Sequence, residues 1–147
     1  MNALRRLIGA LKDWDRTFEQ RVVAAAADNS AEIIRLNTDE QLYRGRDAKG
    51  QPLRPRYHPI TRDIKRAKGQ PFDRVTTRDT GAFHRAFKVT AKKKELAVTS
   101  TDPKAPDLEA KYGELYGLDP TNLQTFTDNL RPEVVRRFDK HLSDALD

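Results

Sequence analysis

Residues 2–43 read NALRRLIGALKDWDRTFEQRVVAAAADNSAEIIRLNTDEQLY, and this proline-free stretch decides the fold. A helix over its whole length would measure about 60 Å at roughly 1.5 Å per residue. A compact chain of this size is only about 30 Å across. We therefore expect the helix to project, to lie against another subunit, or to break near Asn29, where Ser30 is placed to cap a second helix. Apolar side chains recur at steps of three and four residues and form one helical stripe: Leu4, Leu7, Ile8, Leu11, Trp14, Phe18 and Val22.

The middle of the chain predicts irregular structure followed by a β hairpin. Glycines and prolines punctuate residues 44–59, and a short basic helix is expected over residues 60–68. Asp79 is placed to cap a second short helix. Apolar and polar side chains then alternate over residues 87–92 and 95–99, with a break at Lys93 and Lys94. This alternation predicts a hairpin near residues 87–101 with one buried face.

The rest of the chain predicts helices. Asp107 is placed to cap one of them, and Asp119 followed by Pro120 is typical of the start of another. Pro132 is expected to open the last helix. The expected fold class is therefore α+β: a long N-terminal helix, a small antiparallel sheet built on the hairpin, flanking short helices and a C-terminal helical segment. We expect a single domain over residues 1–147, with a helical arm (1–43), a basic loop region (44–78), a short helix plus hairpin (79–101) and an acidic helical part (102–147).

Charge is segregated along the chain. The whole sequence has 28 Lys and Arg against 22 Asp and Glu, a net charge of +6. Residues 44–94 hold 16 against 4 (+12), residues 1–43 hold 6 against 7 (−1) and residues 95–147 hold 6 against 11 (−5). Such a chain attracts polyanions, or it attracts copies of itself with basic face against acidic face. The basic patch that we expect to face DNA or a neighbouring subunit comprises Arg44, Arg46, Arg54, Arg56, Arg62, Lys65, Arg66 and Lys68.

Residues for catalysis or metal binding are not found in a recognisable arrangement. Cysteine is absent, and the only histidines, His58, His84 and His141, lack the spacing of a metal pair on a helix. The tripeptide at residues 79–81 (DTG) occurs in aspartic proteases, but here TTR precedes it instead of an apolar strand. We therefore predict no enzyme and no catalytic, metal or cofactor site. No apolar run is long enough for a membrane span or a cleavable signal peptide, so a membrane partner is not expected. Predicted structural turns and caps are Gly45, Asp47, Gly50, Asp79, Gly81 and Asp119.

The order of these turns resembles a family of small tailed-phage virion morphogenesis proteins, of the neck and tail-completion type. The resemblance covers about residues 30–101. It rests on residues 42–53 (LYRGRDAKGQPL), Tyr57, Thr61 and Lys65, residues 69–71 (GQP) and 73–75 (DRV), and residues 78–83 (RDTGAF) running into 87–89 (FKV). The chain departs from the family at Arg78, where a leucine is frequent. It departs again at residues 111–117 (KYGELYG), which replace a "Tyr-Ala-x-x-His-x-Gly" segment.

The resemblance implies a structural subunit at the phage head–tail junction that works by oligomeric assembly. Its implied partners are other copies of the chain in a hexameric or dodecameric ring, the portal, adaptor or stopper proteins, the tail terminator or tail tube, and the transiting viral DNA. The implied location is the neck or tail end of the virion, after assembly in the host cytoplasm. The alternative function is a basic nucleic-acid-binding accessory protein, for which the charge alone is the argument.

Overall fold

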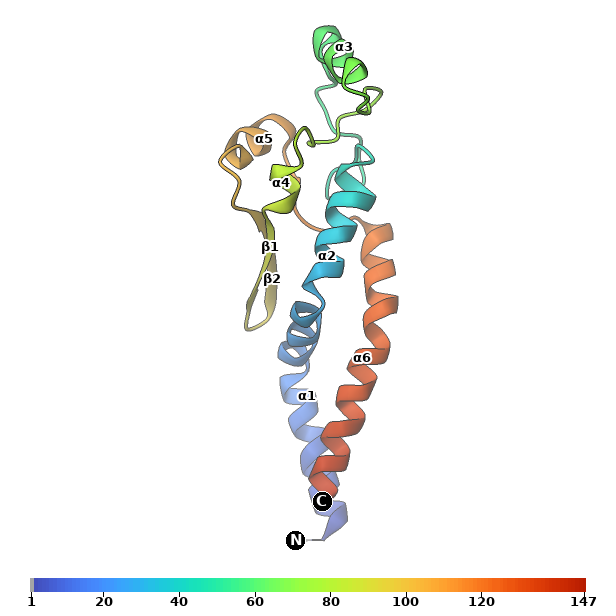
Figure 1. The fold of residues 1–147 in the computed structure, drawn as a ribbon. Coiled ribbons are helices and arrows are strands. Elements are labelled where there is room, and N and C mark those ends of the chain that lie inside the picture. Colours follow the sequence, from blue (N-terminus) through green and yellow to red (C-terminus); the bar gives the residue numbers. More distant parts are fainter. Residues whose placement is uncertain (1) are drawn as a thin grey trace.

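The computed structural model describes residues 2–147 and has the expected α+β fold, in which two long antiparallel helical segments form an arm (Figure 1). Both termini lie at one end of the arm, and helix α3 lies beyond the other end. The arm consists of α1 (Ala3–Asp28), α2 (Ser30–Asn37) and the π-helix η1 (Thr38–Leu42) on one side, and α6 (Pro120–Leu146) on the other. The head consists of residues 43–86 and 101–118, with α3 (Pro59–Ala67), α4 (Ala82–Arg85) and α5 (Ala105–Tyr112). A hairpin, β1 (Phe87–Lys92) and β2 (Glu95–Ser100), extends from the head along the arm (Figure 1).

The N-terminal helical segment is interrupted at Asn29 but continues along the arm. The side chain of Asn2 caps α1 by accepting a hydrogen bond from the backbone N–H of Arg5 at 2.9 Å. Asn29 ends α1, and its side chain donates to the carbonyl of Ala25 at 2.8 Å. The prediction that Ser30 caps the next helix is wrong, because Asn29 occupies the N-cap position and Ser30 is already helical. Of the three arrangements expected for this segment, two are realised: the helix breaks at Asn29, and the segment projects as an arm, where helix α6 of the same chain packs against it.

Aromatic and polar contacts join α1 to α6. The rings of Trp14 and Phe138 lie 5.0 Å apart between their centroids. The imidazole of His141 contacts the carbonyl of Ala10 at 3.0 Å. Near the middle of the arm the guanidinium of Arg137 donates to Asp28 at 2.6 Å. The apolar stripe of α1 is therefore partly covered from within the chain.

The prediction that Pro132 opens the last helix is wrong, because α6 continues through it from Pro120 to Leu146. Proline removes one backbone N–H and normally bends or ends a helix. Pro132 is exposed, so the carbonyl that it leaves unpaired, that of Asp128, can be hydrated. The inward-facing residues on both sides of the proline also stay in helical phase, at Phe126, Leu130, Val134 and Phe138. Packing against α1 thus holds the two halves of α6 in one helix.

The hairpin has the predicted position and its turn at Lys93 and Lys94. Val89 pairs with Val98 and Ala91 with Leu96, so the apolar side chains share one face. That face packs on the arm, where Val89, Leu96 and Val98 contact a cluster formed by α1, α2 and α6. A two-stranded sheet is marginal by itself, and in this molecule the helical arm supplies its support. The cluster on the arm consists of Ala25, Ala26, Ile33, Leu36, Phe126 and Leu130, and a second cluster fills the head with Leu42, Leu53, Val75, Phe83, Phe87, Ala105 and Leu115.

Two fully buried amides connect the arm to the loop before α6. Asn37 donates to the carbonyl of Leu115 at 3.0 Å and accepts from the N–H of Gly117 at 2.8 Å. Gln41 donates to the carbonyl of Gly117 at 2.8 Å and accepts from the N–H of Asp119 at 2.8 Å. Buried polar groups are costly unless they are paired. Because every hydrogen bond here satisfies a backbone group of the loop, these amides fix where α6 begins.

Candidate functional site

The predicted basic patch lies on the head, and part of it is free of intramolecular partners. Arg46, Arg54, Arg56 and Arg62 are exposed, and within residues 2–147 their side chains form no hydrogen bond or ion pair. The other exposed members are engaged. Arg44 pairs with Glu40 at 3.1 Å, Lys68 pairs with Asp79 at 3.3 Å, and Arg66 stacks on the ring of Phe72 at 4.4 Å.

Lys65 does not belong to this surface, and its prediction as a patch residue is wrong. Its side chain is only 8% exposed. The ammonium donates to the carbonyl of Arg78 at 3.0 Å and to the side-chain oxygen of Gln70 at 3.4 Å, and it lies 5.0 Å from the ring centroid of Tyr57. The sequence showed a basic helix but not which of its faces packs inward, and Lys65 is on the inward face of α3.

A groove of about 250 Å³ lies beside the free arginines. Arg56, Arg62 and Arg74 line it together with the rings of Tyr57 and Phe72. Arg74 is held in place by donating to the carbonyl of Tyr43 at 2.9 Å. Guanidinium groups bind phosphate oxygens, and aromatic faces stack on bases. The groove thus combines the two chemical features that single-stranded nucleic acids require.

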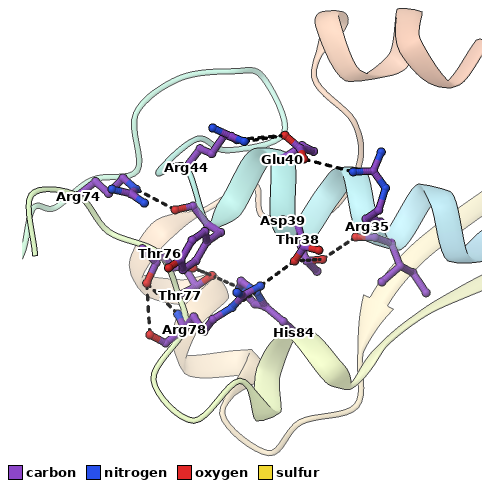
Figure 2. A network of polar contacts seen from close by, with 12 residues as sticks. Arg35, Thr38, Asp39, Glu40, Arg44, Arg74, Thr76, Thr77, Arg78 and His84 are labelled. Carbon is purple, nitrogen blue, oxygen red and sulfur yellow. Dashed lines mark hydrogen bonds and ion pairs between the residues drawn. The ribbon is translucent and has the colours of Figure 1, made fainter. Parts of the chain in front are cut away.

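A polar network fixes the head on the arm (Figure 2). Arg78 from the head donates to Asp39 of η1 at 2.8 Å and to Nδ1 of His84 at 3.1 Å. Since Nδ1 accepts this bond, Nε2 of His84 carries the proton and donates to the hydroxyl of Thr77 at 2.8 Å. Burial, with a smaller contribution from Arg78, lowers the pKa of His84 from 6.5 to about 4. The network is therefore built around a neutral imidazole at neutral pH.

The predicted turn at residues 45–51 is stabilised by hydrogen bonds to the side chain of Asp47. The carboxylate of Asp47 accepts from the N–H groups of Lys49 and Gln51, each at 2.9 Å. Gly45 and Gly50 both have a backbone φ of 82°, an angle that residues other than glycine rarely adopt. Asp119 caps α6 as predicted, by accepting from the N–H of Asn122 at 2.8 Å. These contacts fix the conformation of the loop that carries Arg46, the first of the free arginines.

Two predicted caps are wrong. Gly81 is the N-cap of α4, and the hydroxyl of Thr80, rather than the carboxylate of Asp79, accepts from the N–H of Ala82 at 3.3 Å. Asp79 instead binds Lys68 and Gln70, which lowers the pKa of its carboxyl. Asp107 lies inside α5, and Asp102 accepts from the N–H of Lys104 at 2.8 Å before that helix. An aspartate near the start of a helix can cap that helix, or it can bind a side chain from another segment. The sequence alone does not distinguish these two possibilities.

The segregated charge is not neutralised inside the chain. Among residues 2–147 the only ion pair between the basic segment 44–94 and the acidic segment 95–147 joins Lys49 to Glu114 at 3.4 Å. Helix α6, which runs away from the head (Figure 1), pairs acidic with basic side chains of its own, such as Glu133 with Arg137 at 3.0 Å and Asp144 with Lys140 at 2.7 Å. Part of the basic charge of the head, at Arg46, Arg54, Arg56 and Arg62, is therefore left without an ion-pair partner among residues 2–147.

The lower half of the arm has an uncovered apolar face. The hairpin covers the helices down to its tip, where Lys94 lies 3.9 Å from Glu19 of α1. Beyond this point Trp14 is buried against Phe138 of α6, but one edge of the apolar stripe of α1 has no cover. Its side chains are between 42% and 64% exposed: Leu4, Ile8, Leu11 and Phe18. Val135 and Leu146 of α6 are exposed as well. Exposed apolar side chains on one face of a helix are a candidate interaction surface.

No family model, curated protein or solved structure matches this chain. Within residues 2–147 no group of three or more His, Cys, Asp and Glu side chains is placed to hold a metal ion. None of the helices in the same residues is both long enough and apolar enough to cross a membrane.

Proposed function

We propose that this protein is a structural subunit of the tailed-phage neck or tail end, and that it works by oligomeric assembly. The uncovered apolar face of α1 carries the proposal. In the upper half of the arm, the hairpin covers apolar side chains of the helices. In the lower half, apolar side chains of α1 are exposed, and such a surface is suited to contact with another protein. The family resemblance over residues 30–101 supplies the location at the head–tail junction.

The charge distribution supports a ring made of copies of the chain. The basic segment 44–94 and the acidic segment 95–147 of one molecule form a single ion pair among residues 2–147, between Lys49 and Glu114, so charge of both signs remains available to neighbours. Contacts between unlike surfaces of identical subunits close into a ring when the rotation permits. A hexamer or a dodecamer is the expected assembly, with a portal, adaptor, stopper, tail terminator or tail tube protein above and below it.

The assembly proposal is tested with a double substitution on the uncovered face. Leu4→Asp with Ile8→Asp places two carboxylates on the stripe, and Gln20→Asp, on an exposed position of the same helix, is the control. Native mass spectrometry and negative-stain microscopy are applied to each protein, alone and with tailed-phage portal and tail proteins. We expect rings or partner complexes with the wild type and the control, and their loss in the double variant. A wild-type chain that stays monomeric and joins no neck protein refutes the proposal.

A second candidate function is binding of nucleic acid by the head. Four unpaired arginines and an arginine groove with two aromatic walls favour it. Fluorescence anisotropy with single-stranded and double-stranded DNA, at several salt concentrations, measures the affinity. The expected result is an affinity that falls steeply with salt, with a shallower slope for Arg56→Ala. Lys65→Ala is not the appropriate test, because that side chain lies inside the head. Absence of binding at low salt removes this candidate.

A further inference from the structure

Lys65 places a buried positive charge beside a cavity, and this charge has no carboxylate partner within residues 2–147. Its two hydrogen-bond acceptors are the neutral oxygens of Arg78 and Gln70. The charge of Lys65 contributes slightly to the lowered pKa of Asp79. That carboxylate, however, is exposed and pairs with Lys68 at 3.3 Å. Buried ions are normally paired with an opposite charge, because an ion loses much of its hydration on burial. The partners of the Lys65 ammonium are thus two neutral oxygens and the ring of Tyr57, with no carboxylate among them.

The cavity next to Lys65 has a volume of about 210 Å³ and lies between α3, α4 and α5. Its walls include the rings of Tyr57, Phe83 and Tyr112 and the side chain of Leu108. This volume is below the range of typical drug-sized sites, roughly 300–1,000 Å³, so it suits a ligand the size of one side chain. The apolar walls favour a hydrocarbon or aromatic stem.

Tyr112 adds a second donor. Its hydroxyl forms no hydrogen bond in the part of the chain that the structure describes, although the ring is half-buried against the cavity. Burial and the neighbouring Tyr57 raise the pKa of Tyr112 above 10, so the phenol keeps its proton at neutral pH. The lining also holds the carboxylates of Asp79 and Asp102. Asp79 pairs with Lys68, and Asp102 accepts from the backbone N–H of Lys104, while the ammonium of Lys104 has no ion-pair partner in the same residues.

We propose that this cavity binds a carboxylate carried on a short apolar stem. The carboxylate would lie at Lys65 and Tyr112, and the stem would lie among Tyr57, Phe83 and Leu108. A charge-assisted hydrogen bond to a buried ammonium is stronger than one between neutral groups. The proposal does not depend on the assembly function, because the cavity is formed within one chain.

Two sources can supply this chemistry, a free small carboxylate or an acidic segment of a neighbouring protein. The exposed segment 142–147 (LSDALD) combines leucine with aspartate. It lies at the opposite end of the molecule from the cavity (Figure 1), so it can reach the cavity only from another copy. The test therefore uses both sources as probes.

Isothermal titration calorimetry compares hydrocinnamate, its neutral amide, and a peptide of residues 142–147 blocked at both ends. We expect hydrocinnamate or the peptide to bind, and the amide to bind about 10- to 100-fold more weakly than hydrocinnamate because it lacks the charge. Binding of the peptide alone assigns the site to a protein segment, and binding of hydrocinnamate assigns it to small carboxylates. If neither probe binds at millimolar concentration, or if amide and carboxylate bind equally, the proposal is wrong.

Substitutions identify the site. Lys65→Met removes the charge at similar length and is expected to abolish the preference for carboxylate over amide. Lys88→Met removes a positive charge from an exposed position of β1 that does not line this cavity, and it should bind as the wild type does. If Lys65→Met fails to fold, Leu108→Trp, which fills the cavity and keeps Lys65, should reduce carboxylate affinity at least about tenfold. Unchanged binding in Leu108→Trp contradicts the proposed location.

Discussion

Acidification is expected to weaken the contact between head and arm through His84. The folded protein lowers the pKa of this residue from 6.5 to about 4. Between these values the unfolded chain binds a proton that the folded chain does not, so stability falls as the pH falls. The contribution of His84 is fully present above about pH 6.5 and is lost progressively towards about pH 4. A difference of about 2.5 pKa units corresponds to about 3 kcal/mol in the free energy of unfolding.

Geometry gives the same direction. Nδ1 of His84 accepts a hydrogen bond from Arg78 at 3.1 Å. A protonated imidazole places a second N–H at this position, facing a guanidinium. Arg78 also holds Asp39 of the arm at 2.8 Å. Protonation therefore disturbs the polar connection between head and arm as well as the histidine itself.

The measurement is urea unfolding at several pH values between 7 and 4.5, compared between the wild type and His84→Gln. Glutamine is neutral throughout this range, so the variant should lose less stability than the wild type on acidification, although it is less stable at pH 7. His58→Gln, at an exposed histidine, is the control and should follow the wild type. Carboxylates with lowered pKa values, such as those of Asp79 and Glu133, affect all three proteins equally. Parallel curves for the wild type and His84→Gln between pH 6.5 and 4.5 refute the reasoning.

Three further substitutions test other parts of the fold by chemical unfolding. Asn37→Leu leaves a buried carbonyl and a buried N–H of the loop before α6 without partners, and should cost at least about 2 kcal/mol; a loss under about 0.5 kcal/mol contradicts the role of the buried amides. Gly45→Ala places a methyl group 3.1 Å from Cβ of Arg74 at φ of 82°, and should cost about 1–3 kcal/mol. Pro132→Ala restores a backbone donor in an exposed turn of α6 and should stabilise the protein by about 1–3 kcal/mol; a destabilised variant contradicts this account of Pro132.

The sequence was sufficient for the fold class because periodicity dominates it. Each of three sequence patterns predicts an element that the structure contains. They are the helical stripe that begins at Leu4, the strand alternation that begins at Phe87, and the helix start at Asp119 and Pro120. The prediction at Pro132 failed because proline often marks the start of a helix, whereas here the helical spacing of the apolar residues continues across it. The inward residues before and after the proline continue one stripe, and this continuity was readable in the sequence.

The candidate site was less accessible to sequence reasoning, because it depends on contacts between distant residues. The buried position of Lys65 follows from packing of α3 on the loop that contains Arg78, and no periodicity reports that contact. The roles of Asn37 and Gln41 were missed as well. Their spacing of four residues on one helical face was the available signal, since two amides on a face that is otherwise apolar usually have partners.

The length of the arm has a consequence for how this molecule can connect others. Helix α6 has 27 residues and thus a length of about 40 Å, with the basic head at one end and the uncovered apolar face near the other. Two different macromolecules bound at these places would not touch each other, and the distance between them would be set by helix length. Deleting matched heptads from α1 and α6 would shorten that distance by about 10 Å per heptad.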